Sequence, residues 1–150
     1  MIRFPSFGCL AKRILSLVAI CFSISITGCG GNSDLASVTG KITFDDKPLA
    51  DAFVVFSPTS AGTTSYGRTN SAGEYEMVFS DNEKGAWLGE NIVRITTGDV
   101  GTGSSSAKKE ILPSVYNVNS TLRQTVEKKT NRFDFDLKSS AGKIKQTITE

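Results

Sequence analysis

Cys29 is the side chain in this sequence whose position most clearly indicates chemistry. It ends the segment Ile26-Thr27-Gly28-Cys29, directly after an uncharged run over residues 14–26. Three basic residues and no acidic residue precede that run. The run is shorter than the roughly 20 apolar residues that a transmembrane helix needs, but it fits a secretory signal peptide. Small residues before a cysteine suit a peptidase that cuts in front of a lipid-modified thiol.

This pattern resembles the lipobox of bacterial lipoproteins. The resemblance implies cleavage after residue 28 and a mature chain that begins at Cys29 and is held to a membrane by acyl chains. One chain binds only reversibly, at about 0.8 kcal/mol for each buried CH₂, whereas the triple acylation of that class would be durable. Gly30 stands where, in some bacteria, an Asp retains such proteins at the inner membrane. We therefore expect export to the outer membrane or cell surface. The alternative is an ordinary Cys29 after a conventional signal peptide.

The sequence offers few residues that could act in nucleophilic catalysis. The sequence contains no His, which excludes Ser-His-Asp and Cys-His sites and removes the commonest zinc ligand. Cys9 and Cys21 lie in the segment predicted to be removed, and lipidation would consume the thiol of Cys29. We therefore expect no disulfide in the mature domain, in spite of its exported setting.

Two pairs of carboxylates are the remaining candidates for acid–base or metal chemistry. Asp45 and Asp46 are adjacent in a predicted turn, and Asp134 and Asp136 share one face of a predicted strand. Hydrolysis needs two acids across a cleft, and Ca²⁺ prefers clustered oxygen ligands. We interpret both pairs as solvated side chains. The sequence thus predicts no catalytic residue, no metal, no cofactor and no enzymatic activity.

The charge balance bears on the class of partner. The chain has 17 Lys and Arg against 15 Asp and Glu. Arg3, Lys12 and Arg13 belong to the predicted signal segment, which leaves 14 basic against 15 acidic residues, a formal net charge of −1. A nearly neutral domain argues against nucleic acid and against strong electrostatic docking on a membrane.

A contact surface could involve Trp87, Lys108 and Lys109. Trp87 is either an anchor in the core or at an edge, or an exposed contact for a glycan or a protein. The two lysines form a small basic spot beside Glu110 that we expect to be solvated. They end a Gly/Ser/Thr-rich loop over residues 98–109, which is either a binding loop or a connector. The same alternatives of core or contact apply to Tyr66, Tyr75 and Tyr116.

The residues after Cys29 show the two-residue alternation of β-strands. Residues 38–44 alternate between apolar and polar side chains, and residues 45–48 have turn chemistry. Residues 52–56 are apolar on both faces, as expected of a central strand covered on two sides, and Pro58 ends that run. Residues 89–97 predict a further strand.

Two hairpins are also predicted. The first joins a short strand over 65–69, with Tyr66 and Arg68 on one face, to the alternating residues 75–79 across a turn at Gly73. The second joins residues 122–126 to 132–137 across the polar residues 128–131.

Residues 38–56 and 68–75 resemble the carboxypeptidase regulatory-like, or transthyretin-like, β-sandwich domain. In that family a strand, a turn that ends in Pro-Leu (here Pro48-Leu49), an Ala-led strand and a Thr…Gly-x-Tyr hairpin follow in this order. Asp46 and Asp51 depart from it, since the family often has Gly at these turn positions. The resemblance implies a β-sandwich outside the cytoplasm. It carries over no catalytic residue, because the domain is typically an accessory module.

The fold class that follows is all-β, with a single antiparallel β-sandwich of about seven strands, transthyretin-like or Ig-like, after a helical signal peptide. We divide the chain into a signal peptide, a lipidated cysteine with a short tether, the sandwich and a polar tail. Their bounds are 1–28, 29–37, 38–138 and 139–150.

The predicted function is that of a lipid-anchored, non-enzymatic protein of the cell envelope, a structural or protein-interaction module. Its partners would be the membrane, through the lipid on Cys29, and an unknown envelope protein or glycan, but no nucleic acid. The alternative is a surface module that binds a carbohydrate or small ligand. That alternative predicts a concave site lined by Trp87 and a tyrosine, and burial of all four rings would count against it.

Overall fold

The computed structural model describes residues 34–80, 83–98 and 108–145. The predicted signal peptide, Cys29 and residues 99–107 of the predicted loop lie outside the described residues. Every described residue belongs to one compact unit, Gly31–Glu150.

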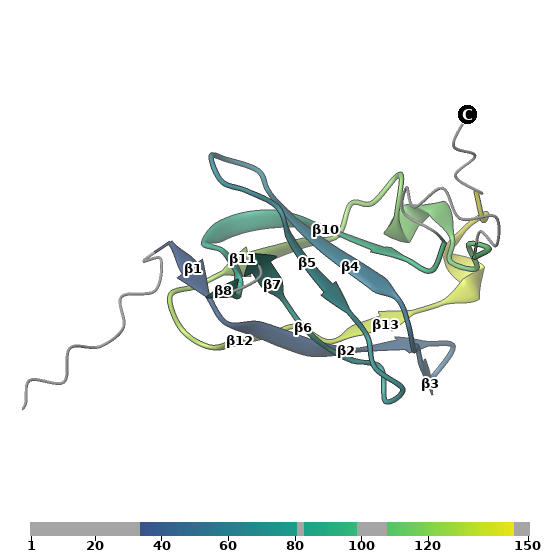
Figure 1. Cartoon of the computed structure of the whole chain (residues 1–150). Coiled ribbons are helices and arrows are strands. Elements are labelled where there is room, and N and C mark those ends of the chain that lie inside the picture. Colours follow the sequence, from purple (N-terminus) through teal and green to yellow (C-terminus); the bar gives the residue numbers. More distant parts are fainter. Residues whose placement is uncertain (1–33, 81–82, 99–107, 146–150) are drawn as a thin grey trace, which may run out of the picture. The chain divides into compact units, whose positions relative to one another are not determined.

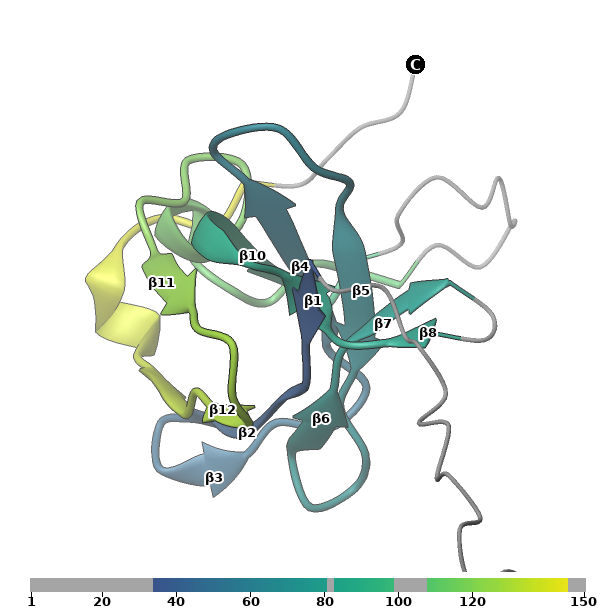
Figure 2. The ribbon, with the colours of Figure 1, turned by 90° about the vertical axis from the view of Figure 1, so that its left-hand side faces the viewer.

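Two β-sheets face each other across the apolar core of this unit (Figures 1 and 2). The larger sheet has six strands in the order β11-β10-β4-β5-β7-β8, and its neighbours are antiparallel. These strands are β4 (Phe53–Pro58), β5 (Ser65–Arg68), β7 (Val78–Ser80), β8 (Glu83–Lys84), β10 (Gly89–Thr96) and β11 (Arg123–Val126).

The smaller sheet is built around β2 (Val38–Phe44). On one side β3 (Lys47–Pro48) and β6 (Glu74–Glu76) pair with it antiparallel. On the other side β12 (Asn131–Arg132) and β13 (Phe135–Leu137) pair with it parallel and in one register, so they act as a single interrupted strand. At the interruption the Phe133 N–H donates to the Thr39 carbonyl, and the Lys41 N–H donates to Asp134 Oδ1. The expectation of a purely antiparallel sandwich is therefore wrong at this edge.

The predicted hairpin between residues 122–126 and 132–137 does not form. β11 lies on the larger sheet beside β10, whereas β12 and β13 lie on the smaller sheet. The buried Asn131 side chain holds the crossover: it accepts from the Glu127 N–H and donates to the carbonyls of Glu127, Lys129 and Ser37. A side chain thus supplies the bonds that a hairpin turn would otherwise make between backbone groups.

The predicted strand over residues 75–79 splits at Met77. Before it, β6 pairs with β2; after it, β7 pairs with β5 through Tyr66 and Val78. Met77 is fully buried, its N–H donates to the Val38 carbonyl and its carbonyl accepts from the Gly85 N–H. The chain therefore passes from one sheet to the other here, and only part of the first predicted hairpin is present.

A small third sheet joins β1 (Leu35–Ala36) to β9 (Ala86–Trp87). Leu35 and Ala36 were expected in the tether, but they belong to the folded domain, and Ala36 is buried. Residues 139–145 of the expected tail are also partly structured. They include the 3₁₀ helix η2 (Ser139–Ala141) and a bridge between Ile144 and Pro113, next to the 3₁₀ helix η1 (Ser114–Tyr116).

The core lies between the two larger sheets, and strand alternation supplies it. Side chains at every second position of β2, β4 and β10 point inward, as the two-residue period predicted. The largest apolar side chains with at most 1% exposure are Val38, Ile42, Val54, Phe56, Met77, Val93, Ile95, Leu112 and Leu137. Gly40 lets the sheet edge close, because a Cβ there would collide with the Phe133 carbonyl and the Tyr75 ring.

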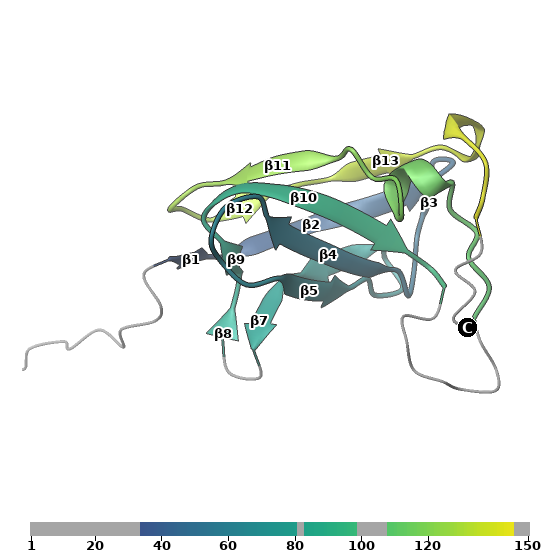
Figure 3. The same ribbon diagram turned by 90° about the horizontal axis from the view of Figure 1, so that it is seen from above.

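The domain has two ends, which Figure 3 shows from above. The β1 end carries β1, the β4–β5 connection and the β11–β12 crossover. The loop end carries the turn at Asp45 and Asp46, the chain at Asp51, and the residues on either side of the 99–107 segment. Among the described residues, the helices are too short to cross a bilayer.

Candidate functional site

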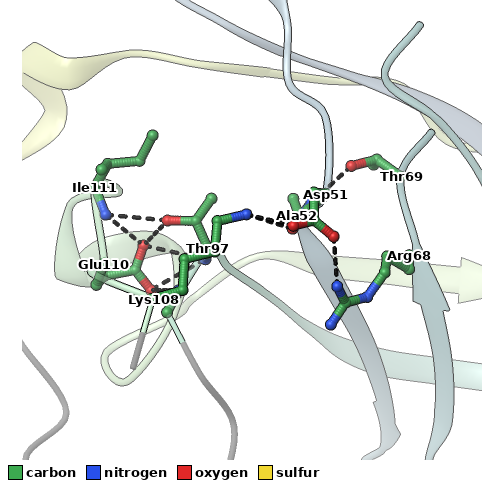
Figure 4. A network of polar contacts seen from close by, with 9 residues as sticks. Asp51, Ala52, Arg68, Thr69, Thr97, Lys108, Glu110 and Ile111 are labelled. Carbon is green, nitrogen blue, oxygen red and sulfur yellow. Dashed lines mark hydrogen bonds and ion pairs between the residues drawn. The ribbon is translucent and has the colours of Figure 1, made fainter. Parts of the chain in front are cut away.

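The strongest polar cluster of the described residues lies at the loop end, where Asp51 leads into β4 (Figure 4). Asp51 has a left-handed backbone, with φ of 59°, and three hydrogen bonds tie it and Ala52 to Thr69. This geometry directs the Asp51 carboxylate outward. One of its oxygens pairs with Arg68, and the other accepts from Lys108 Nζ at 2.6 Å. Hydrogen bonds from Lys108 and Arg68 lower the pKa of Asp51.

Glu110 is a buried acidic residue that stabilises the loop end through its hydrogen bonds. Its side chain was expected beside a solvated basic spot, but the residue is only 4% exposed. Its carboxylate accepts from the hydroxyls of Thr96 and Thr97, the second at 2.6 Å, and from the N–H groups of Ile111 and Leu112 at 2.9 Å. Burial alone would raise the pKa of Glu110, but these hydrogen bonds together lower it. Glu110 therefore fastens the end of β10 to the chain that follows residue 107.

The outer face of the larger sheet carries aromatic and cationic side chains together. Phe53 and Tyr66 stack with ring centroids 5.6 Å apart, and Tyr66 is 46% exposed. Cross-strand register aligns Arg94, Val55, Tyr66 and Val78 in one row across four strands. We call the following set the outer-face patch: Phe53, Val55, Tyr66, Arg68, Val78, Arg94 and Lys108.

The expectation that residues 52–56 are covered on both faces is wrong for the outer face. Val54 and Phe56 are fully buried, whereas Phe53 and Val55 are only half-buried. The apolar side chains on the outer side of residues 52–56 therefore belong to the outer-face patch. They are not covered by another layer of the described structure. The prediction that Tyr66 and Arg68 share a face is confirmed by the burial pattern of β5.

The predicted contact residues do not come together. Trp87 lies at the β1 end, half-buried against Phe79 and over Gly62, where a Cβ would meet its ring. Lys108 pairs with Asp51 at the loop end, and Lys109 is exposed next to it.

Of the tyrosines, Tyr75 is buried and stacks on Phe135, Tyr116 is half-buried, and Tyr66 is exposed. The ring partner of Trp87 is a phenylalanine and not one of the tyrosines.

One member of each predicted carboxylate pair contacts Lys138. Its Nζ lies 2.7 Å from Asp46 Oδ1 and 3.1 Å from Asp136 Oδ2, and the Asp45 carboxylate accepts from the Ser139 N–H. Hydrogen bonds from Thr43 and Lys138 lower the pKa of Asp136. Asp134 pairs with Arg132 instead. Within residues 34–80, 83–98 and 108–145, no group of three or more acidic, His or Cys side chains is arranged to hold a metal ion.

Comparisons with known proteins yield little. No model of a protein family matches the chain, and no curated protein matches it. The chain is structurally similar to part of a 9R-lipoxygenase from Cyanothece PCC8801, at 15% identity and a TM-score of 0.39. The match covers 87% of this chain but only 20% of the lipoxygenase. The match gives no indication of activity.

Proposed function

We propose that this protein is a lipid-anchored, non-enzymatic protein of the bacterial cell envelope that presents a binding surface on a β-sandwich. Export and acylation at Cys29 are supported by the sequence pattern at residues 1–29. The proposal includes membership of the carboxypeptidase regulatory-like family. Asp46 and Asp51 support it, because both adopt the positive φ that the Gly of the family would favour at these positions.

The observation that carries the proposal is the position of the outer-face patch relative to the start of the domain. Five residues lie between Cys29 and Leu35, so the six residue steps span at most about 22 Å at full extension. An acylated Cys29 would therefore keep the β1 end close to the membrane. β2 has 7 residues, which separates the loop end from the β1 end by about 23 Å. Arg68 and Lys108, at the loop end, would then lie farther from the anchored residue than β1 does.

A non-enzymatic role is supported by how the acids near the patch are used. Glu110 is buried and accepts hydrogen bonds from donors on both sides of the 99–107 segment, so its lone pairs serve the fold. Asp51 is held between two cations, and its pKa is lowered by them. Neither carboxyl has the raised pKa that a general acid needs at neutral pH.

The test is fractionation and mass spectrometry of the full chain, expressed in a bacterium with lipoprotein processing. The wild type is expected in the membrane fraction, to start at Cys29 and to carry fatty acids. Globomycin or Cys29→Ser should leave an unlipidated precursor, while the matched control Cys21→Ser should be processed normally. A native protein with an intact Met1 and no fatty acid, or a Cys29→Ser chain that still matures in the membrane, overturns the proposal.

A further inference from the structure

The outer-face patch joins two exposed chemical features, aromatic rings and cations, on one side of the larger sheet. We propose that this patch binds an anionic polysaccharide, with the acidic groups of the glycan on Arg68, Arg94 and Lys108 and its sugar rings against Tyr66 and Phe53. The inference rests on the proposed function, which puts the patch outside the cytoplasm, where such polymers occur.

The strands that carry the patch direct recognition to side chains. β10, β4 and β5 are interior strands of the six-stranded sheet, with a hydrogen-bonded neighbour on each side. Their backbone groups are paired, so a peptide cannot add to them as another strand, the mode that a sheet edge would offer. A ligand on this face must therefore lie across the side chains.

The cross-strand register sets the spacing of the cations. Arg94 lies opposite Val55, and Arg68 lies opposite Phe53 two residues along the same middle strand. Two strand spacings and two residue rises place the Cα atoms of Arg94 and Arg68 about 12 Å apart. The Phe53–Tyr66 stack lies between them. An extended polymer with repeated acidic groups can reach both guanidinium groups while its rings contact the aromatic pair.

The electrostatics of the patch favour an anion. Arg68 and Lys108 keep 63% and 45% of their side-chain surface exposed although both pair with Asp51. Arg94 donates to the Ser57 hydroxyl over a long 3.4 Å and forms no ion pair with another described residue. Within the outer-face patch the described side chains thus supply three cations, and two of them share the exposed carboxylate of Asp51.

Three acidic side chains near the patch have partners of their own among the described residues. Glu90, four residues before Arg94 on β10, pairs with Arg123, and Glu76 pairs with Lys84. Glu110 is buried, and its oxygens accept from Thr96, Thr97 and the following N–H groups. Glu90 and Glu76 are therefore paired with cations outside the patch, whereas the charge of Glu110 remains. Among the described residues, Arg68, Arg94 and Lys108 against Asp51 and Glu110 leave a formal charge of +1 at the patch.

The test is affinity electrophoresis of the full chain, purified in a nonionic detergent, through gels that contain one polymer each. Polygalacturonate offers carboxylates, dextran sulfate offers sulfates, and neutral dextran and poly-glutamate serve as controls. We expect retardation by at least one acidic glycan, weakened by salt, and none by neutral dextran. Retardation by polygalacturonate or by dextran sulfate alone would identify the acidic group.

Single substitutions separate the patch from the overall charge. Arg68→Gln and Arg94→Gln should each weaken binding about threefold, and Tyr66→Ala by a similar factor. Arg132→Gln and Lys129→Gln each remove one positive charge away from the larger sheet, on β12 and in the β11–β12 crossover, and they should leave binding unchanged. Equal losses in patch and control variants, equal binding of poly-glutamate, or no retardation by either acidic glycan would overturn the assignment. Cys29→Ser should not alter glycan binding. The fractionation experiment therefore tests the lipid anchor, and the gel experiment tests the patch independently of it.

Discussion

The Thr97 hydroxyl donates a hydrogen bond of 2.6 Å to Glu110 Oε1, which links the end of β10 to the chain after residue 107. Glu110→Gln would keep the shape of this side chain but would replace an acceptor oxygen with an amide that meets N–H and O–H donors. We expect a loss of about 1–3 kcal/mol in the free energy of unfolding at pH 7. Urea unfolding measures it, with Glu90→Gln on the same strand as the control that should change little.

The same carboxylate predicts a pH dependence. The pKa of Glu110 is lower in the folded protein than its ordinary value of 4.5, because its hydrogen bonds outweigh burial. Its contribution to stability is therefore present above pH 4.5 and is lost as the pH falls through the lower folded pKa. The wild type should lose stability in this window, and Glu110→Gln should lose less. Parallel acid-induced losses in both proteins would contradict the assignment.

How much of this fold the sequence predicts depends on whether a feature is local. The strand over residues 38–44, the end of β4 at Pro58 and the positive φ of Gly73 follow from alternation and turn chemistry. The parallel pairing of residues 131–137 with β2 does not, because an alternating strand looks the same on either sheet. Its choice of sheet depends on the Asn131 side chain, which acts across the crossover.

The candidate site likewise has features that follow from local sequence and features that depend on distant residues. A shared face for Tyr66 and Arg68 follows from their two-residue spacing. The stack of Tyr66 on Phe53 and the row that includes Arg94 depend on the register between strands, which no single segment contains. The burial of Glu110 depends on Thr96 and Thr97, which lie 14 and 13 residues earlier in the chain. A lone acidic residue beside two lysines gives no local sign of these partners.

The turn between β2 and β3 offers a test of backbone strain. Asp45 and Asp46 have φ of 48° and 65°, a region in which a Cβ costs energy and Gly does not. Asp46→Gly should leave the midpoint of thermal unfolding unchanged or raise it, although it removes the exposed pair with Lys138. Asp46→Ala should lower stability by up to about 1 kcal/mol, because it loses the same exposed pair and, since it keeps the Cβ, gains no relief of the positive φ. Equal effects of the two variants would show that the ion pair, and not the backbone, decides.

Gly40 tests the closure of the parallel edge, where the backbone of residue 133 approaches β2. A methyl group on Gly40 would overlap the Phe133 carbonyl, which also accepts a 2.7 Å hydrogen bond from the Tyr75 hydroxyl. Gly40→Ala should therefore separate β2 from residue 133 and cost about 3 kcal/mol in the free energy of unfolding. Gly142→Ala is the matched control, because its backbone is extended at φ of 165° and its nearest neighbour, Val115 Cγ1, is 3.4 Å away. A Gly40→Ala protein as stable as Gly142→Ala in urea would contradict the close parallel pairing of β2 with residues 131–137.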